Sequence, residues 1–364
     1  MTKAISAREF TAAAAATWVA VVDGLPGSID TVAESAVPTH RFLRRAWYAA
    51  AVEAYGGVPR TIVVHEHGLP VAVLPMVGLG PRALGLMTVP GSYWPFRSLA
   101  VSIAASDAVP GALLDGVGAA ARGLRIGPVY DRDPAASALI AAARARGWAV
   151  LDRFVAQSWL LDMAAQQQAG VWPRLSTLRK NRFHEKHLAT HGALDWRFLD
   201  GPDWPDGFAS LGAVEERSWI AARTDGGDAK FTRIGHIAFW RAAAHDPVLA
   251  GMFHAALLSV DGAPAAFSFD IDVGETKYAI ANSYVPDFAK HSPGRLLYWR
   301  NLSDALGRGL TTVDWGAGDS GYKQVIGAEP GPAIRDWLLL RPGLPAAAGR
   351  ALAWVWKRSG NAEN

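Results

Sequence analysis

The chain has 364 residues, of which half are hydrophobic and 19% are charged, and its formal net charge at pH 7 is +3. This composition excludes an intrinsically disordered chain, and the length allows two domains of ordinary size. Because the chain has no cysteine, disulfides, thiolate metal sites and cysteine nucleophiles are excluded, which fits the cytoplasm. The small net charge does not by itself require a nucleic-acid partner.

No stretch of the sequence has the length and apolarity of a membrane-spanning helix. The apolar stretch from Ala12 to Val22 is too short to cross a bilayer. Arg8-Glu9 directly before it is atypical of a signal peptide. We therefore expect a soluble, cytoplasmic protein without a membrane span.

The first part of the chain predicts a hairpin followed by a helix. Residues 1 to 40 are expected to form a lead-in helix and loop, and His40 to Tyr55 carries apolar residues at helical spacing. Two strands, Thr61 to Val64 and Val71 to Met76, then flank a turn. A helix from Val109 to Arg122 ends at Gly123, and a strand begins at Leu124.

The same series of elements recurs in the second part of the chain. Strands Phe253 to Val260 and Ala265 to Val273 flank a turn, and helix Pro293 to Arg308 leads through Gly309 into strand Thr311 to Trp315. Both turns contain Gly-x-Pro, at Gly68 and at Gly262. The order of elements indicates a degenerate internal duplication. We expect an α/β (α+β) fold of two halves, each a mixed sheet flanked by helices, over residues 1–155 and 156–342, with a tail helix in 343–364.

Several short motifs carry a resemblance to a known family. The chain resembles the GNAT-superfamily acyltransferases, and within them the CelD-type group of cellulose-biosynthesis acetyltransferases and their Fem-type relatives. The resemblance covers roughly residues 155 to 342, and a basic segment beginning at Arg174 also fits that group. The motifs are Glu216-Arg217-Ser218-Trp219, Asp261-Gly262-Ala263-Pro264-Ala265, Ser292-Pro293-Gly294-Arg295-Leu296-Leu297, Asp314-Trp315-Gly316 and Gly321-Tyr322-Lys323.

This resemblance implies transfer of an acyl group from a carrier to an amine. The carrier is an acyl-CoA thioester in most members and an aminoacyl-tRNA in the Fem-type branch. It also implies two tandem GNAT-like halves. The longer helical arm that Fem-type proteins carry between their halves is not evident in this sequence.

The start of the helix at Ser292 is the candidate site for the donor. A helix N-terminus exposes unpaired N–H groups and a partial positive charge, which suit a pyrophosphate. Ser292 is the expected N-cap, Pro293 occupies the first helical position, Gly294 permits close approach of a ligand, and Arg295 adds charge. In GNAT folds the CoA pyrophosphate lies at this place, although the usual glycine-rich Q/R-x-x-G-x-G/A form is absent here. A well-capped structural helix explains the same residues.

The glycine-dense segment Gly316 to Gly321 matches two motifs out of context. It fits the dinucleotide fingerprint G-x-G-x-x-G, but no long helix follows it. It also contains Gly-Asp-Ser-Gly, but no accompanying signature assigns a histidine and an aspartate. We interpret it as a tight loop that places Asp319, Tyr322 and Lys323 at the mouth of the site, with a surface lysine as the structural alternative for Lys323.

Acylation of an amine requires a base, an oxyanion site and an acid for the leaving group. Candidate bases are Glu216, Asp270, Asp319 and His291. Candidate acids are Tyr278, Tyr284 and Tyr322. Each of these residues can equally be structural. Trp219, Tyr284 and Trp315 are the candidate substrate-binding residues, with Trp219 as a pocket wall.

The segment from Arg174 to His191 is strongly basic, with a single acid at Glu185. It would suit an anionic substrate, a nucleotide carrier or RNA, or it is a solvated helix face. The histidines at 184, 187 and 191 lack the pattern of a metal site, so we expect no bound metal.

The sequence therefore predicts an N-acyltransferase that moves an acyl group from acyl-CoA (acetyl-CoA) to an amine of a small molecule or of an envelope or polysaccharide precursor. Nucleic acid is not an expected partner, except for tRNA if the protein is a Fem-type aminoacyl transferase. A third hypothesis is a non-catalytic GNAT-like accessory protein of polysaccharide biosynthesis. The oligomeric state is not predicted.

Overall fold

The structure is a computed structural model that describes residues 17–92, 96–172, 174–221, 229–317 and 322–361. The chain divides into two compact units. Unit 1 comprises residues 1–157 and 332–364, and unit 2 comprises residues 158–331. The chain thus passes from unit 1 to unit 2 and back, whereas the C-terminal half expected from the sequence extended to residue 342.

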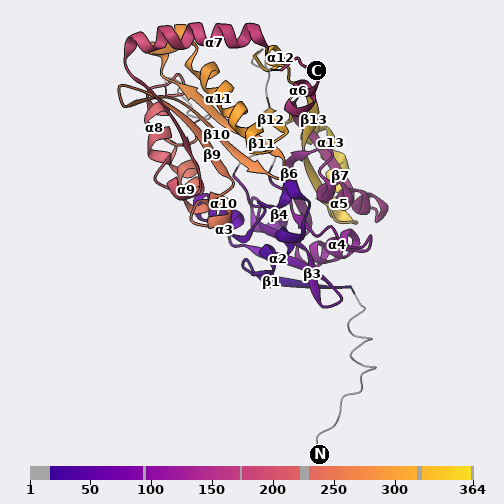
Figure 1. The fold of residues 1–364 in the computed structure, drawn as a ribbon. Helices are drawn as coiled ribbons and strands as arrows, with labels where there is room; N and C mark the ends of the chain where they lie inside the picture. Colours follow the sequence, from indigo (N-terminus) through magenta and orange to yellow (C-terminus); the bar gives the residue numbers. More distant parts are fainter. Residues whose placement is uncertain (1–16, 93–95, 173, 222–228, 318–321, 362–364) are drawn as a thin grey trace, which may run out of the picture. The chain divides into compact units, whose positions relative to one another are not determined.

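Unit 1 is a mixed sheet with helices packed on it (Figure 1). Its strands follow the order β1-β2-β3-β4-β6-β13, with β5 paired to β3. The strands are β1 (Trp18–Asp23), β2 (Arg60–Glu66), β3 (Leu69–Gly78), β4 (Leu86–Thr88), β5 (Ala100–Val101), β6 (Gly123–Tyr130), β7 (Ala149–Asp162, which continues into unit 2) and β13 (Glu329–Leu340). The helices are α2 (Ser28–Ser35), α3 (Arg45–Tyr55), α4 (Val109–Ala120), α5 (Pro134–Ala145) and α13 (Leu344–Arg358), with short η1 (Pro38–His40) and η2 (Arg82–Leu84).

The strands of unit 2 follow the order β7-β12-β11-β10-β9-β8 and pair both in parallel and antiparallel. Its own strands are β8 (Leu194–Leu199), β9 (Phe253–Val260), β10 (Ala263–Val273), β11 (Thr276–Tyr284) and β12 (Thr312–Ala317). Its helices are α6 (Met163–Gln168), α7 (Leu175–Leu188), α8 (Phe208–Glu216), α9 (Ile234–Ala243), α10 (Pro247–Ala250), α11 (Pro293–Gly307) and α12 (Tyr322–Val325), with short η3 (Ala189–His191), η4 (Gly201–Asp203) and η5 (Pro286–His291). The expected α+β class with two sheet-and-helix halves is confirmed.

The two units repeat one order of elements. In unit 1 the hairpin β2–β3 is followed by β4, helix α4 and strand β6, which pairs in parallel with β4. In unit 2 the hairpin β9–β10 is followed by β11, helix α11 and strand β12, which pairs in parallel with β11. A helix that joins two neighbouring parallel strands is a βαβ crossover. Each unit therefore carries the same hairpin and crossover.

Both hairpin turns use positive backbone angles at two successive residues. His67 and Gly68 have φ of 51° and 79°, and Asp261 and Gly262 have φ of 47° and 77°. Two-residue turns with positive φ match the right-handed twist of the strands that they join. The turns predicted at these positions are therefore confirmed.

Two predictions for the N-terminal region are wrong. The part of the lead-in that the structure describes contains strand β1, paired with β2, and helix α2. The predicted helix from His40 begins only at Arg45. Val19, Val21 and Val22 favour a strand, and β-sheet pairing outweighs the helix propensity of the neighbouring alanines.

The sheet of unit 2 separates two kinds of packing. On one face α8 and α9 cover an aromatic core, whereas α11 and α7 lie on the other face (Figure 1). The aromatic core is formed by Trp204, Phe208, Phe231, Trp240, Phe253 and Phe269. Because side chains alternate along a strand, Ser268 and Asp270 of β10 face α11 instead. The polar residues of unit 2 are thus gathered beneath α11.

Candidate functional site

Strands β11 and β12 pair over only three positions. The parallel register runs from Thr276–Thr312 to Tyr278–Asp314, and β11 then continues for six residues to Tyr284. In the register with β10, Ala279 lies opposite Asp270 and Ala281 opposite Phe269, so one extra residue, Ile280, is inserted in β11. A β-bulge bends its strand and turns backbone groups out of the ladder. The end of β11 is therefore free to approach the start of α11.

Helix α11 begins at a strained residue. Ser292 has φ of 52° and ψ of 51°, the left-handed region, and its side chain makes no capping hydrogen bond. Ser292 is thus the N-cap residue, as predicted, but its side chain does not cap the helix, and Pro293 occupies the first turn as predicted. The Arg295 amide bonds the Ser292 carbonyl at 3.0 Å. Within the described residues the Gly294 amide has no acceptor, which leaves a donor available to a ligand.

Gly294 allows the first turn of α11 to lie against β11. A Cβ at this position would lie 3.2 Å from Oδ1 of Asn282 and 3.2 Å from Cδ1 of Tyr284. The Nδ2 atom of Asn282 is buried and has no hydrogen-bond partner within the described residues. A buried amide donor without an acceptor is costly, and a ligand that accepts from it would remove that cost. Asn282 thus joins the candidate site, and no local motif in the sequence indicated it.

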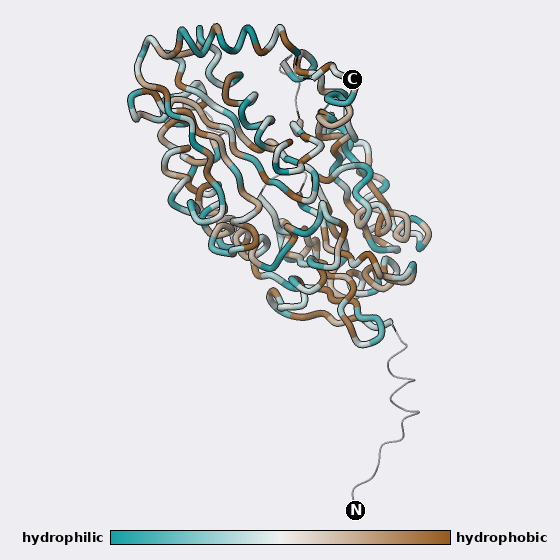
Figure 2. The backbone as a smooth tube through the Cα atoms, in the orientation of Figure 1, coloured by the Kyte–Doolittle hydropathy of each residue, from teal (hydrophilic) through white to brown (hydrophobic). Residues whose placement is uncertain are grey.

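Cations surround the same helix start. Burial, together with the charges of Lys180, Arg295 and His187, lowers the pKa of His184 below its ordinary value. His184 lies on α7, which packs against α11 and η5. Cationic groups thus lie near the start of α11, an arrangement that favours an anionic ligand. Figure 2 shows α7 in hydrophilic and pale colours along most of its length.

Two histidines meet directly before the start of α11. Nε2 of His191 lies 2.9 Å from Nε2 of His291, and the His291 side chain is buried. At this distance one ring donates a proton to the other, so the two rings cannot both be protonated and keep the bond. Described residues in this region form no cluster of three or more groups that could hold a metal.

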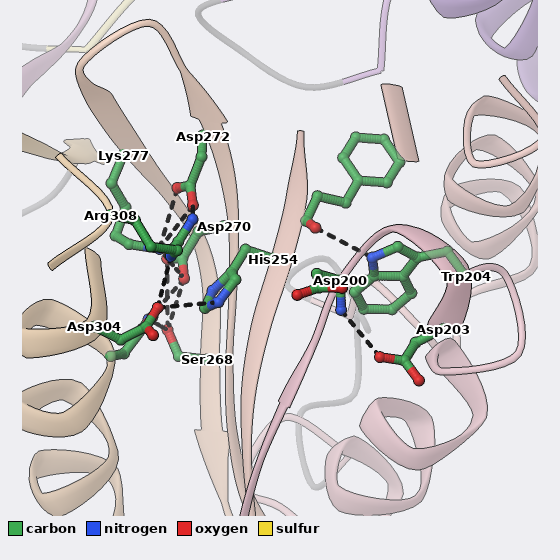
Figure 3. A network of polar contacts seen from close by, with 12 residues as sticks. Asp200, Asp203, Trp204, His254, Ser268, Asp270, Asp272, Lys277, Asp304 and Arg308 are labelled. Atoms are coloured by element: carbon green, nitrogen blue, oxygen red, sulfur yellow. Dashed lines mark hydrogen bonds and ion pairs between the residues drawn. The ribbon is translucent and has the colours of Figure 1, made fainter. Parts of the chain in front are cut away.

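A buried ionic network fixes α11 to the sheet (Figure 3). Nζ of Lys277 lies 3.0 Å from Asp270, and both side chains are almost fully buried. Asn301 of α11 donates to Ser268 at 3.0 Å and to Asp270 at 2.7 Å. Asp270 is therefore an ion-paired structural residue, which contradicts its candidacy as a catalytic base.

The outer part of this network lies at the C-terminal end of α11. Arg308 pairs with Asp272 at 2.8 Å and with Asp304 at 2.7 Å, and His254 lies 3.3 Å from Asp304 (Figure 3). Burial raises the pKa of Asp304, but hydrogen bonds from His254 and Arg308 outweigh burial and hold it at about 2. The network positions the helix that carries the candidate site.

Lys323 has a structural role. Its side chain is buried, and Nζ donates to the carbonyls of Trp315 at 3.0 Å and Ala317 at 2.9 Å. It holds the end of β12 instead of lining an open site as predicted. Asp319 lies outside the described residues. Tyr322 begins α12, and its side chain also lies outside the described part.

Besides His291, which directly precedes Ser292, most of the other predicted residues that the structure describes do not lie at the start of α11. Glu216 is exposed at the end of α8, on the opposite face of the sheet from α11. Its neighbour Glu215 is buried and accepts hydrogen bonds from the amides of residues 230–232. Trp219 is 42% exposed, and Trp315 is buried in a core cluster against Tyr298. Tyr284 lies beside Gly294, as Asn282 does.

Comparison with known proteins places the family resemblance in unit 2. Residues 175–324, about two fifths of the chain, match the family described as "Acetyltransf_6: Acetyltransferase (GNAT) domain". No protein of curated function matches the chain.

Solved structures share the fold over nearly the whole chain. The crystal structure of FemX has 12% identity and a TM-score of 0.59, with 89% of this chain and 97% of that chain covered. A conserved protein of unknown function from Bacteroides thetaiotaomicron VPI-5482 has 10% identity and a TM-score of 0.56, with 88% of this chain and all of that chain covered.

Proposed function

We propose that the protein is an N-acyltransferase that uses acyl-CoA as donor, because residues 175–324 match the model of a GNAT-type acetyltransferase domain. The observation that carries this proposal is the first turn of α11, where the Gly294 amide and Nδ2 of Asn282 lack acceptors within the described residues. Bound acyl-CoA would supply an activated thioester carbonyl for attack by an amine.

The residues at this turn have distinct roles in the proposal. The Gly294 amide donates to the donor's pyrophosphate, and the guanidinium of Arg295 and the helix dipole add positive charge. The Asn282 amide donates to the same ligand from β11. The ring of Tyr284 covers the adjacent surface and excludes water from it.

The chemistry at the amine is assigned by resemblance. Tyr322 is proposed as the acid that protonates the leaving thiolate, and Asp319 as a base for the ammonium. Lys323, next to Tyr322 in the chain, donates to the carbonyls of Trp315 and Ala317 at the end of β12. The proposed acceptor is an amine of a small molecule or of an envelope or polysaccharide precursor.

Calorimetric titration with acetyl-CoA, longer acyl-CoAs and free CoA tests the donor. We expect binding to the wild type and about tenfold weaker binding to Arg295→Ala, because one charge-assisted contact is lost. Arg300→Ala is the matched control, since Arg300 lies further along α11 and contacts Trp196 and Glu185. Absence of binding to every CoA species would reject the proposal.

A second candidate function is transfer from aminoacyl-tRNA. It is favoured by the exposed basic face of α7, formed by Arg179, Lys180, Arg182 and Lys186. Filter binding of charged tRNA distinguishes the two donors. Salt-sensitive tRNA binding that is lost in Arg179→Glu/Arg182→Glu, with no CoA binding, would favour this function.

A further inference from the structure

Helix α13 of unit 1 packs with small side chains and Trp356, and it exposes several other large apolar side chains. Ala346 and Gly349 are buried, and Ala353 and Trp356 pack against the same cluster, formed with Leu151 and Leu340. The outward face carries large apolar side chains with high exposure: Leu344 87%, Leu352 59%, Trp354 63% and Val355 53%. An amphipathic helix of a globular protein normally buries its largest apolar residues. The exposure of large apolar side chains on α13 therefore requires an explanation.

The exposed face does not result from incomplete docking of the helix. A Cβ on Gly349 would overlap the side chain of Leu340, so the helix lies as close to the sheet as glycine allows. Its C-terminal end is also fixed, because Asn361 donates its amide to Phe154 at 3.0 Å. The guanidinium of Arg153 stacks on Trp356 at 4.4 Å. The outward residues are therefore held at the surface by a well-packed inner face.

Other helices of unit 1 show the usual arrangement. In α4 and α5, which the structure describes throughout, no large apolar side chain is exposed. The exposed apolar face of α13 is thus not shared by α4 and α5, and the other exposed apolar side chains of unit 1, such as Leu84 and Ile103, lie outside these three helices.

The charges of α13 indicate the kind of surface that it fits. Among its 15 residues there is no aspartate or glutamate, and the cations are Arg350, Lys357 and Arg358. The Arg358 guanidinium lies 4.2 Å from the ring centroid of Trp354. A helix with tryptophan, leucine and valine beside lysine and arginine lies in the plane of a membrane interface, where the cations meet anionic headgroups. A protein partner would require acidic groups that face this same apolar band.

We propose that the outward face of α13 binds the surface of a membrane that contains anionic lipids. Leu352, Trp354 and Val355 enter the interface, and Arg350 and Lys357 contact lipid phosphates. The helix lies on the bilayer and does not cross it, since no described helix is long and apolar enough to span a membrane. The proposal is independent of the acyl donor.

Vesicle flotation of the full chain tests the proposal. We expect binding to vesicles of phosphatidylcholine with added phosphatidylglycerol, and weaker binding to phosphatidylcholine alone or at high salt. Leu352→Ser/Trp354→Ser and Arg350→Glu/Lys357→Glu should each reduce binding at least about tenfold. The matched control is Leu84→Ser/Ile103→Ser, which removes two exposed apolar side chains of unit 1 outside α13 and should leave binding unchanged.

Three results would overturn the proposal. The first is no binding of the wild type to either vesicle, and the second is binding that both α13 variants retain. The third is a dimer by light scattering that Leu352→Ser/Trp354→Ser abolishes, without vesicle binding, because a second copy of the chain would then cover the face. Circular dichroism melts show that the variants are folded, as substitutions at exposed positions allow.

Discussion

The crossover helices of the two units have the same place in the fold but different first turns. In α4 the carbonyl of Gly111 accepts a hydrogen bond from Arg146 at 2.8 Å, and the arginine side chain lies over the backbone of that turn. In α11 the corresponding turn faces Asn282 and Tyr284 of β11. The family match covers α11 and does not extend to α4. The duplicated topology thus does not duplicate the surroundings of the helix start, and the proposed donor site lies at α11, where no described arginine side chain covers the first turn as Arg146 does in α4.

Each unit contains a buried carboxylate, Asp270 in unit 2 and Asp336 in unit 1, and the two are paired with different cations. Removing the cation beside Asp270 is expected to give the largest change in stability. Lys277→Met leaves Asp270 without its buried cation and should lower the free energy of unfolding by about 3–5 kcal/mol. Urea denaturation measures the change. The double variant Asp270→Asn/Lys277→Met should recover much of the loss, since no uncompensated charge then remains. If the single variant is as stable as the wild type, the ion pair does not hold unit 2.

The carboxylate of unit 1 should be less sensitive. Asp336 is buried and binds Arg125 at 2.6 Å and Arg153 at 2.7 Å, but both arginines are about one fifth exposed and can be hydrated. We expect Asp336→Asn to cost about 1.5–3 kcal/mol, as for hydrogen bonds to charged groups. The same denaturation experiment ranks the two variants. A loss larger than that of Lys277→Met would reverse the comparison.

The first turns of α4 and α11 can be compared directly by substituting their glycines. Gly294→Val introduces a side chain against Asn282 and Tyr284 and should weaken acyl-CoA binding about tenfold or more, or about 1.4 kcal/mol. Gly111→Val displaces only the flexible end of Arg146 and should leave binding unchanged. Titration calorimetry on both variants measures this. Equal effects would mean that the donor does not bind at α11.

The smallest expected effect concerns pH. Burial and the charges of His191, Lys290, His187 and His184 lower the pKa of His291 below its ordinary value of 6.5. Because the unfolded chain then binds this proton more readily than the folded one, the stability contribution is full above pH 6.5 and decreases as the pH falls below it. Melting temperatures over a pH series, for the wild type and His191→Gln, measure the effect.

The variant His191→Gln removes one neighbouring charge and should flatten the dependence on pH. Thr190→Ala is a matched control, since it removes a hydroxyl that bonds the His187 carbonyl and changes no titratable group. An identical slope for wild type and His191→Gln would show that the histidine pair does not sense pH.

Local chemistry explains which parts of the fold could be predicted from the sequence. The turns at Gly68 and Gly262, the end of α11 before Gly309 and the tail helix from Leu344 all depend on neighbouring residues. Strand β1 was not predicted, because the alanines before it in the sequence favour a helix. The strand is defined by its pairing with β2, which the local sequence does not show. The pairing of β13 with β6 joins residues about 200 positions apart, and no local pattern encodes it.

In the candidate site, too, the sequence predicted the residues that depend on local structure and missed those that depend on distant strands. Helix periodicity placed Pro293, Gly294 and Arg295 in the first turn, as the structure has them. Asn282 was missed because only the packing of β11 against Gly294 gives it a role. Lys323 was misassigned because its burial depends on the carbonyls of β12. Side chains whose role depends on a distant strand cannot be recognised from spacing alone.

The chain begins in unit 1, forms unit 2 and then returns to unit 1, and this order affects how the protein folds during its synthesis. Residues 334–340 of β13 pair with β6, and residues 158–162 of β7 pair with β12. Unit 1 thus receives its last strand from the far end of the chain, whereas both of these β7 and β12 segments belong to the contiguous unit 2. A ribosome that has made residues 1–157 has not yet made the strand that pairs with β6, so unit 1 stays incomplete until nearly the whole chain has emerged. We expect unit 2, whose residues are contiguous, to complete its fold first, so that the half made first is finished last.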